Sequence, residues 1–312
     1  MFLVCGEALF DFFYQAAEDE QPSRIAYQAV AGGSPFNVAV GLRRLGVDSG
    51  FLAGLSTDFL GARLRSVLAS EGVSNQWLQD FAAPTTLSMV AVGSDGSPQY
   101  SFRGEGCADR LLTPDQLPSL DASVRGLHVG SFSLVVEPIG NTLLSLVRRE
   151  SQRRLISLDP NVRLNAEPDI DKWRRRVADF AAHAHLIKVS EEDLLLLYPE
   201  QALEDIAQGW LTQQCQLVFI THGGQGATVY SRRHGSAWVP AQAITVADTV
   251  GAGDTFQAAL ITWLTEHRAD TPAGLAELSR DDLETVLKFA AAAAAITCTR
   301  IGPDLPYRQQ LA

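Results

Sequence analysis

The sequence predicts an α/β protein with a mostly parallel sheet and a small β appendage. Short apolar runs without strict alternation recur along the 312 residues, which is typical of strands buried on both faces. A longer helix-like segment follows most of these runs, and such alternation indicates βαβ units. Two strand-like stretches interrupt the pattern, and they predict the appendage.

Each core element has a local signal. Strands are expected at the apolar runs 2–6, 49–55, 126–130, 154–159, 185–190 and 216–223. Helices are expected at 35–46, 61–72, 138–150 and 203–214, where apolar residues recur with helical spacing. The alanine run Ala290–Ala295 lies within a further helical pattern and fits simple helix packing.

The appendage is expected at residues 12–30 and 84–104. The first stretch is polar and strand-like, and the second alternates around a turn rich in Gly, Ser and Pro. Such alternation is the signature of a hairpin with one packed face. No internal repeat or linker interrupts the chain. We therefore expect a single domain, 1–312, into which this small subdomain is inserted.

Composition excludes several functions. The net charge is -11 and no long basic block is present, which argues against binding to a nucleic acid. The four cysteines are far apart and form no CxxC pair, so we expect reduced thiols in a cytoplasmic protein. The N-terminus lacks the basic region of a secretion signal, and no apolar run is long enough for a membrane span.

The stretch DTVGAGDTFQAA, residues 248–259, carries the most specific chemistry. Apolar spacing becomes helical after Gly253, so the glycine-rich loop leads into a helix N-terminus. The free N–H groups and the helix dipole there form an anion hole, and glycine allows a ligand to come close. Asp254, at the rim, could accept a proton from an attacking hydroxyl. The alternative is that Asp254 only caps the helix.

Three other stretches supply matching parts. AGGSPFNVAVGLRRLG at 31–46 places a glycine pair before a helix that has Asn37 at its opening. SLDPNVR at 157–163 puts Asp159, Asn161 and Arg163 at the end of a strand, where open α/β sheets bind ligands. VFITHGGQGATVY at 218–230 places a glycine-rich turn between two β-like runs, able to lie against a nucleotide.

These segments resemble the ribokinase-like family of carbohydrate kinases, of the phosphofructokinase-B type. The stretch 248–259 resembles the family's C-terminal signature, 31–46 its N-terminal one, and GLSTDFLG at 54–61 the segment that follows. SFRGEGCADRLL at 101–112 and DPNVR resemble the fructokinase branch. The resemblance covers nearly the whole chain, and it implies a three-layer α/β/α core with a small β lid.

The resemblance also implies residue roles on the sugar side. Asp254 matches the family's catalytic base, and the backbone of Gly251, Ala252 and Gly253 would form the anion hole. Asp11 and Asn37 would hold sugar hydroxyls, and the hinge glycines below the lid would be the pair at 32–33. The matching sugar-side positions are Asp11, Gly32, Gly33, Asn37 and Arg163. For Arg163 a surface salt bridge is the alternative.

On the nucleotide side the matching positions are Lys188, Ser190, Thr221, Gly223 and Gly226. Asp248 and Thr249 match positions that bind a monovalent cation in some members, or they only close the turn. The family's usual Asn-x-x-Glu is replaced by KVSEEDLL, which leaves Glu192 and Asp193 as candidates to order water around Mg²⁺, or as ordinary helix N-terminal acids. His222 is interpreted as a packed loop histidine.

The implied function is an ATP- and Mg²⁺-dependent sugar kinase, with K⁺ as a further ion. D-fructose phosphorylated at its 6-hydroxyl is the expected reaction, and the lid would close over the sugar. The alternatives are another acceptor, namely 2-keto-3-deoxygluconate, ribose or a nucleoside, and a non-catalytic sugar-sensing protein of the same fold. The lid could also pair two chains as a homodimer.

Overall fold

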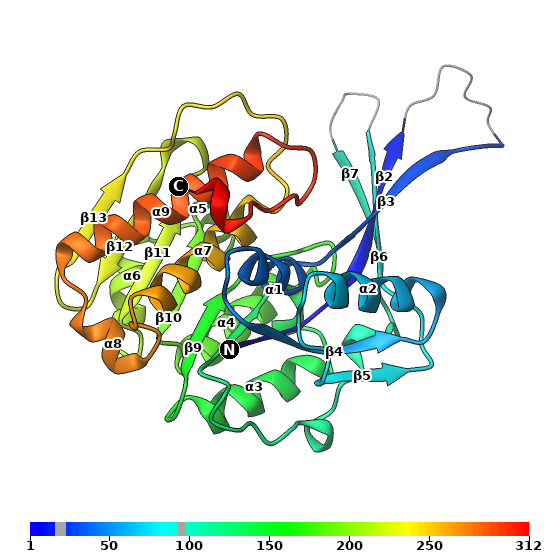
Figure 1. Cartoon of the computed structure of the whole chain (residues 1–312), viewed down its shortest axis with the longest axis horizontal. Coiled ribbons are helices and arrows are strands. Elements are labelled where there is room, and N and C mark those ends of the chain that lie inside the picture. The colour runs from blue at the N-terminus through cyan, green and yellow to red at the C-terminus, as the bar shows by residue number, and fades with distance from the viewer. Residues whose placement is uncertain (16–22, 93–97, 312) are drawn as a thin grey trace.

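The computed structural model describes residues 1–15, 23–92 and 98–311. Its centre is a nine-stranded sheet with the order β13-β12-β11-β10-β9-β8-β1-β4-β5 (Figure 1). All neighbours pair in parallel except β11 with β12 and β12 with β13. The strands are β1 Phe2–Cys5, β4 Ser49–Ser56, β5 Leu78–Phe81, β8 Gly126–Gly130, β9 Leu155–Asp159, β10 Leu186–Ser190, β11 Leu217–Thr221, β12 Ala227–Ser231 and β13 Gly235–Val239.

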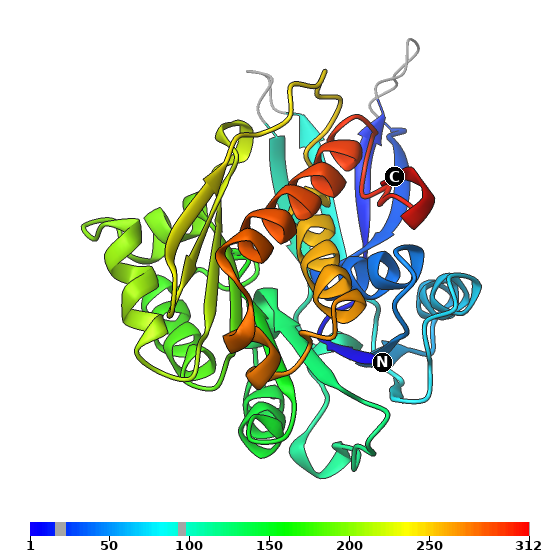
Figure 2. The same cartoon turned by 60° about the vertical axis from the view of Figure 1, so that its left-hand side comes forward.

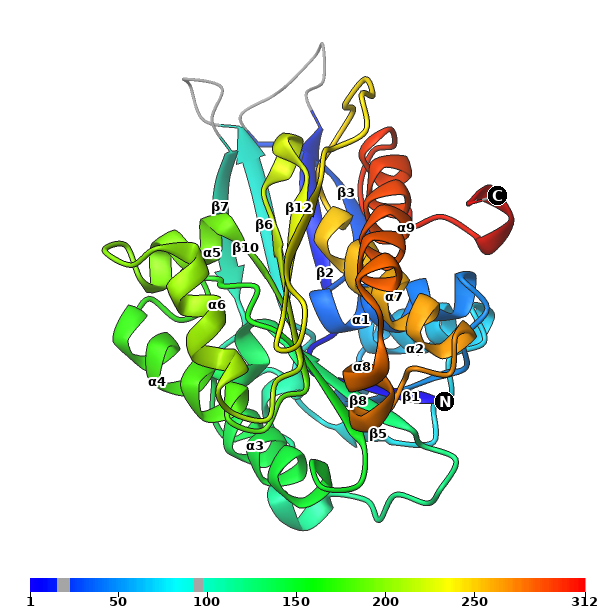
Figure 3. The ribbon, with the colours of Figure 1, turned by 90° about the vertical axis from the view of Figure 1, so that its left-hand side faces the viewer.

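Helices cover both faces of this sheet, as the edge-on view in Figure 3 shows. One face carries α1 Ser34–Arg44, α2 Phe59–Ser70, α7 Ala252–Glu266, α8 Pro272–Glu277 and α9 Arg280–Cys298. The other carries α3 Ile139–Glu150, α4 Ile170–Ala181, α5 Glu191–Leu197 and α6 Leu203–Leu211. The predicted three-layer α/β/α class is confirmed.

The core strands lack alternation of apolar and polar residues because both of their faces are buried. In the paired strands β1 and β4, Val4 and Phe51 pack on the side of α1, while Leu3 and Leu52 pack on the side of α3. All four side chains have 0% exposure. Two separate hydrophobic layers therefore hold the sheet between its helices.

A second sheet of four strands stands out from the core (Figure 1). Its strands are β2 Leu9–Gln15, β3 Ala26–Gly32, β6 Leu87–Val92 and β7 Pro98–Arg103, in the order β3-β2-β6-β7. Two antiparallel hairpins join through the parallel pair β2 and β6. These strands overlap the segments expected at 12–30 and 84–104, of which 16–22 and 93–97 lie outside the described residues.

The signature helix α7 begins earlier than its apolar spacing suggests. Gly251 adopts the left-handed conformation, with φ of 79°, and serves as the N-cap of a helix that starts at Ala252. Gly253 and Asp254 consequently lie in the first helical turn. Figure 2 shows α7 and α9 packed alongside each other over the sheet. Within the described ranges, no helix combines the length and the apolar character that a membrane crossing requires.

Candidate active site

The carboxylate of Asp254 points from α7 toward the start of α1. Its Oδ1 accepts a 2.6 Å hydrogen bond from the Ser34 hydroxyl, and its Oδ2 accepts one of 2.8 Å from Nδ2 of Asn37. All three residues are 8% exposed. No side-chain bond caps the N-terminus of α7. The cap alternative is therefore wrong, and the side chain is directed across a junction between two helices.

The first turn of α7 offers unpaired amides. The N–H of Ala252 donates to Thr249 O at 3.2 Å, whereas those of Gly253 and Asp254 have no partner in the described part of the chain. A Cβ on Gly251 would lie 2.9 Å from Cα of Pro303, and its φ of 79° independently favours glycine. The glycine-rich loop thus presents backbone donors at the positive end of a 15-residue helix.

A buried ion pair lies next to this turn. Nζ of Lys188 is 2.9 Å from Oδ2 of Asp159, and the two side chains are 4% and 1% exposed. A Cβ built on Gly253 would lie 2.9 Å from the same Nζ, so the ammonium group directly adjoins the first turn of α7. Asp159 is the last residue of β9, and Lys188 is the middle residue of the neighbouring parallel strand β10. The predicted nucleotide-side lysine is therefore buried and lies beside the first turn of α7.

The pKa of Asp159 responds to Lys188 and to the charges of two other aspartates. Burial raises its pKa to about 6, the charge and hydrogen bond of Lys188 lower it, and the charges of Asp193 and Asp254 raise it again. Its Oδ1 has no hydrogen-bond partner within the described residues. Glu192, in contrast, is exposed. Of the two candidate acids on α5, Asp193 is the buried one, and its charge acts on Asp159.

The start of α5 is fixed by its own side chains. The Ser190 hydroxyl accepts a hydrogen bond from the N–H of Asp193 at 3.0 Å, which makes Ser190 the N-cap. Oδ1 of Asp193 in turn accepts the N–H of Val162 at 3.0 Å. Asp193 therefore lies in the first turn of α5, as the alternative states, and it also holds the backbone of Val162; its Oδ2 accepts no hydrogen bond from the described residues.

Two of the predicted sugar-side residues, Gly32 and Arg163, interact with Asp11. A Cβ on Gly32 would lie 2.7 Å from Oδ2 of Asp11, so glycine at this position makes room for the carboxylate. Burial raises the pKa of Asp11 to about 6, a hydrogen bond with Ser88 and the charge of Arg163 lower it, and the charge of Asp254 raises it. These interactions bring Asp11, Arg163 and Asp254 into one electrostatic environment.

Two further sugar-side positions have clear geometry. Gly33 has φ of 106°, and a Cβ there would lie 2.9 Å from the carbonyl oxygen of Glu7. Arg163 is exposed and donates to Val162 O at 2.9 Å. It forms no ion pair within residues 1–15, 23–92 and 98–311, so the salt-bridge alternative is not observed there.

The nucleotide-side turn joins β11 to β12. Thr221 ends β11 and is paired with Ser190 of β10, so the two predicted nucleotide segments are neighbours. Gly223 and Gly226 have φ of 54° and 104°. A Cβ on Gly226 would lie only 2.0 Å from Val239 O, so the turn requires glycine there.

The predicted monovalent-cation residues lie in the loop before α7. Oδ1 of Asp248 accepts the N–H of Val250 at 3.1 Å, and Oδ2 accepts that of Gly302 at 2.9 Å. The carbonyl of Thr249 accepts the N–H of Ala252. Closing the turn, the alternative role, is therefore observed. The same carboxylate also ties the loop to the segment after α9.

Sequence reasoning did not find Ser34, Glu7 or the partnership of Lys188 with Asp159. Ser34 lies inside the N-terminal signature segment, and its position before the predicted helix was the available signal. Glu7 is 1% exposed and lies against Gly33; burial raises its pKa to about 7, against a lowering by hydrogen bonds with Ser133 and Ser131.

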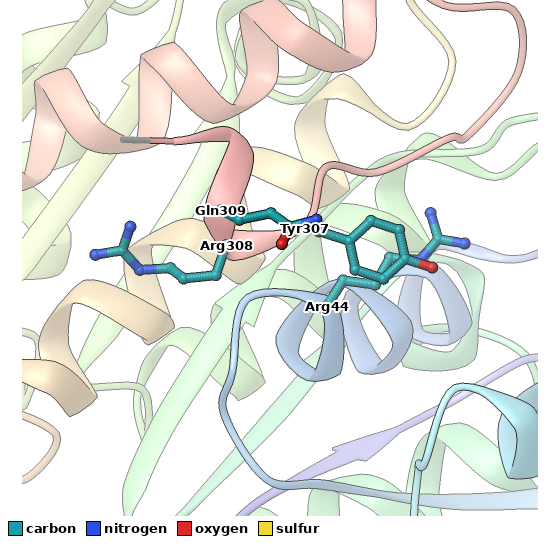
Figure 4. A pocket seen from close by; sticks show the side chains of 4 residues that line it. All are labelled: Arg44, Tyr307, Arg308 and Gln309. Atoms are coloured by element: carbon teal, nitrogen blue, oxygen red, sulfur yellow. The ribbon is translucent and has the colours of Figure 1, made fainter.

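A surface hollow of about 530 Å³ does not belong to this site. Arg44, Tyr307, Arg308 and Gln309 line it, and none of them is a predicted site residue (Figure 4). The two guanidinium groups point in opposite directions in Figure 4, and acidic partners engage both: Arg44 pairs with Glu71 and Arg308 with Glu266. The hollow therefore offers no free cation to an anionic ligand.

Comparisons with known proteins agree with this geometry. The sequence model described as "pfkB family carbohydrate kinase" matches residues 1–310. A fructokinase of Rhizobium leguminosarum bv. trifolii is 35% identical over 283 residues, which cover 91% of this chain and 85% of that protein. Probable fructokinase-4 of Arabidopsis thaliana is 32% identical over 313 residues, with coverages of 98% and 94%.

Solved structures show the same fold. The ATP-bound fructokinase of Xylella fastidiosa superposes with a TM-score of 0.90 at 27% identity, over 99% of this chain and 96% of that one. The Vibrio cholerae O395 fructokinase bound to fructose, ADP and calcium superposes with a TM-score of 0.82 at 25% identity, over 99% and 97%. The chain belongs to the pfkB family of carbohydrate kinases.

Proposed function

We propose that this protein is an ATP-dependent fructokinase that transfers the γ-phosphate of ATP to the 6-hydroxyl of D-fructose. The observation that carries the proposal is the buried carboxylate of Asp254, which lies in the first turn of α7 beside unpaired amides. Membership of the pfkB family supports the reaction class, and relatives named fructokinase support the acceptor.

Asp254 is the general base in this proposal. Hydrogen bonds from Ser34 and Asn37 hold its carboxylate in one orientation, and each oxygen keeps a lone pair for a further donor. The sugar hydroxyl gives its proton to this carboxylate while the hydroxyl oxygen forms a bond to the γ-phosphorus and the bond to ADP breaks. Precise orientation of the base supplies much of the rate because phosphoryl transfer depends mainly on positioning.

The groups around α7 stabilise the transferring phosphoryl group. The free N–H groups of Gly253 and Asp254 and the dipole of α7 attract its negative charge. The ammonium of Lys188, although paired with Asp159, places a cationic group beside Gly253. Because the Lys188–Asp159 pair is buried, its field is weakly screened by solvent.

The residues present fit a magnesium nucleotide. Within the described ranges, no three metal-ligating side chains form a cluster, and Mg²⁺ commonly binds through phosphate oxygens, water and one or two carboxylates. Such an ion neutralises phosphate charge when it is bound. We assign Asp193 rather than Glu192 to its water shell because Asp193 is buried and its charge acts on Asp159, whereas Glu192 is exposed. We propose that Asp248 and Thr249 help to bind K⁺. A potassium-bound form is known for a double mutant of the Vibrio cholerae O395 fructokinase.

The small sheet is the proposed lid over the sugar. Asp11 comes from its strand β2, and Gly32 and Gly33 connect its strand β3 to α1, so movement of this sheet would close the sugar site. The exposed Ile25, beside edge strand β3, is compatible with pairing of two chains through this sheet. The four free cysteines are compatible with a cytoplasmic location.

An acceptor panel tests the proposal. ADP release is measured with D-fructose, 2-keto-3-deoxygluconate, ribose and a nucleoside, each with and without K⁺ and with Mg²⁺ present. Fructose is expected to give the highest kcat/KM. A higher kcat/KM for another acceptor would reassign the substrate, and no ADP release above background with any of them would favour the sugar-sensing alternative.

A further inference from the structure

The imidazole of His222 is held at both nitrogens. Nδ1 lies 2.7 Å from Oε2 of Glu191, and Nε2 lies 2.9 Å from the hydroxyl of Thr228. Glu191 is the first residue of α5, His222 follows β11, and Thr228 lies on β12. One side chain therefore joins three elements next to the turn that connects β11 to β12.

The two contacts determine which nitrogen carries the proton. A carboxylate can only accept, so Nδ1–H donates to Glu191. In a neutral ring Nε2 is then an acceptor, and the hydroxyl of Thr228 supplies the matching donor. The neutral imidazole thus satisfies both partners. The side chains of His222 and Glu191 are 14% and 38% exposed, so water competes mainly at the carboxylate.

The backbone of the same residue closes the turn. The N–H of His222 donates to Gly226 O at 2.8 Å, and its carbonyl accepts the N–H of Gln225 at 3.0 Å. A Cβ on Gly223 or Gly224 would meet no heavy atom within 4 Å, so nothing packs against that part of the turn. Glycines without packing partners leave the chain conformationally free. The side chain of His222 therefore adds a restraint to a turn whose Gly223–Gly224 part has no packing partner of its own.

We propose that Glu191, His222 and Thr228 form a clasp that positions the nucleotide-side turn, residues 221–226, relative to the start of α5. The inference rests on the proposed nucleotide-binding role of that turn. The paired residues Ser190 and Thr221 lie at the junction that the clasp holds. His222 is a positioning residue: its two ring nitrogens are occupied by protein groups, and its effect on the nucleotide passes through the turn.

The test combines direct nucleotide binding with kinetics. Thr228→Val removes the hydroxyl but keeps the shape of the side chain, and Thr228→Ser keeps the hydroxyl. His222→Asn replaces the imidazole with a shorter side chain that cannot reach both Glu191 and Thr228. His234→Asn is the matched control, because His234 lies in the turn at the other end of the β12–β13 hairpin and its side chain makes no hydrogen bond or ion pair with the described residues. Calorimetry gives the Kd for ADP, and steady-state assays give kcat and both KM values.

Loss of one partly exposed hydrogen bond predicts that Thr228→Val and His222→Asn weaken ADP binding and raise the KM for ATP roughly fivefold. The KM for fructose is expected to stay at its wild-type value, and Thr228→Ser and His234→Asn are expected to bind ADP as the wild type does. The double variant His222→Asn/Thr228→Val should lose no more affinity than either single variant, because both remove the same clasp.

Two results would overturn the clasp while leaving the kinase intact. The first is wild-type ADP affinity in folded Thr228→Val and His222→Asn proteins. The second is a fall in kcat and a rise in both KM values by similar factors, together with a lower Tm. This pattern would indicate a general structural role. If the wild-type protein phosphorylated no sugar but its ADP affinity depended on Thr228 and His222 as described, the proposed function would fail and the clasp would be supported.

Discussion

The hydroxyl of Ser34 donates a 2.6 Å hydrogen bond to Oδ1 of Asp254, across a sequence separation of 220 residues. Ser34 is the first residue of α1, and Asp254 is the third of α7. The pair joins the two glycine-containing segments that lie before these helices. The orientation of the proposed base therefore depends on a residue from the opposite end of the chain.

Ser34→Ala should lower kcat roughly tenfold, because one hydrogen bond to a charged group is lost and the carboxylate gains freedom to rotate. The KM for fructose should change little. Steady-state assays with Ser66→Ala as control check this, since the exposed Ser66 donates only to the carbonyl of Ala62 in its own helix. An unchanged kcat in Ser34→Ala would show that Ser34 does not position the base.

Lys188→Met should destabilise the fold by about 3–5 kcal/mol, because Asp159 would remain buried without its partner. Asp159→Asn added to this variant should recover much of that stability, since no charge is then left buried. Urea unfolding measures both effects. The double variant should still turn over at least about a hundredfold more slowly, because the cation beside Gly253 is missing. Wild-type turnover in a stable double variant would remove Lys188 from the mechanism.

Gly226→Ala should cost roughly 2 kcal/mol or more of stability, because its Cβ would overlap Val239 O at 2.0 Å and φ is 104°. Gly224→Ala is the matched control in the same turn, where a Cβ meets nothing within 4 Å. Chemical unfolding compares the two. Equal stabilities would mean that the turn adapts to a side chain at 226.

Glu7 makes stability depend on pH. Burial raises its pKa from 4.5 to about 7, so the folded state retains a proton that the unfolded state loses. Stability from this group is present below pH 4.5 and decreases as pH rises toward 7. From pH 5 to pH 8 the wild type should therefore lose roughly 2 kcal/mol relative to Glu7→Gln.

Urea unfolding of the wild type and of Glu7→Gln at pH 5 and pH 8 gives the difference between their free energies of unfolding at each pH. The contributions of the other titrating groups are the same in both proteins and cancel in this difference. A stability difference between the two proteins that is identical at pH 5 and pH 8 would contradict burial of an ionisable Glu7.

Local patterns predicted the fold well. The apolar runs locate six core strands, and the runs 126–130 and 185–190 coincide with β8 and β10 to within one residue, because burial on both faces leaves a local signal. The short helix α5 was not assigned, since seven residues contain too few turns for a period to appear. The start of α7 was placed too late because the left-handed Gly251, rather than the apolar spacing, determines it.

The site was predictable in its parts but not in its contacts. The Gly-Ala-Gly-Asp stretch shows locally that amides and an acid lie at a helix start. The partners Ser34 and Asp159 depend on which elements become neighbours, and sequence spacing alone does not give this. His222 was interpreted as a packed loop histidine; the contacts at both ring nitrogens require Glu191, which is 31 residues away.

Replacing the proposed base tests the account most directly. Asp254→Asn preserves the shape of the side chain and its place beside Asn37 and Ser34, but the amide cannot take a proton from the sugar. Turnover should fall by about a hundred- to ten-thousandfold, while calorimetry should find fructose and ADP still bound. A variant that phosphorylated fructose at close to the wild-type kcat would contradict the assignment of Asp254 as the base.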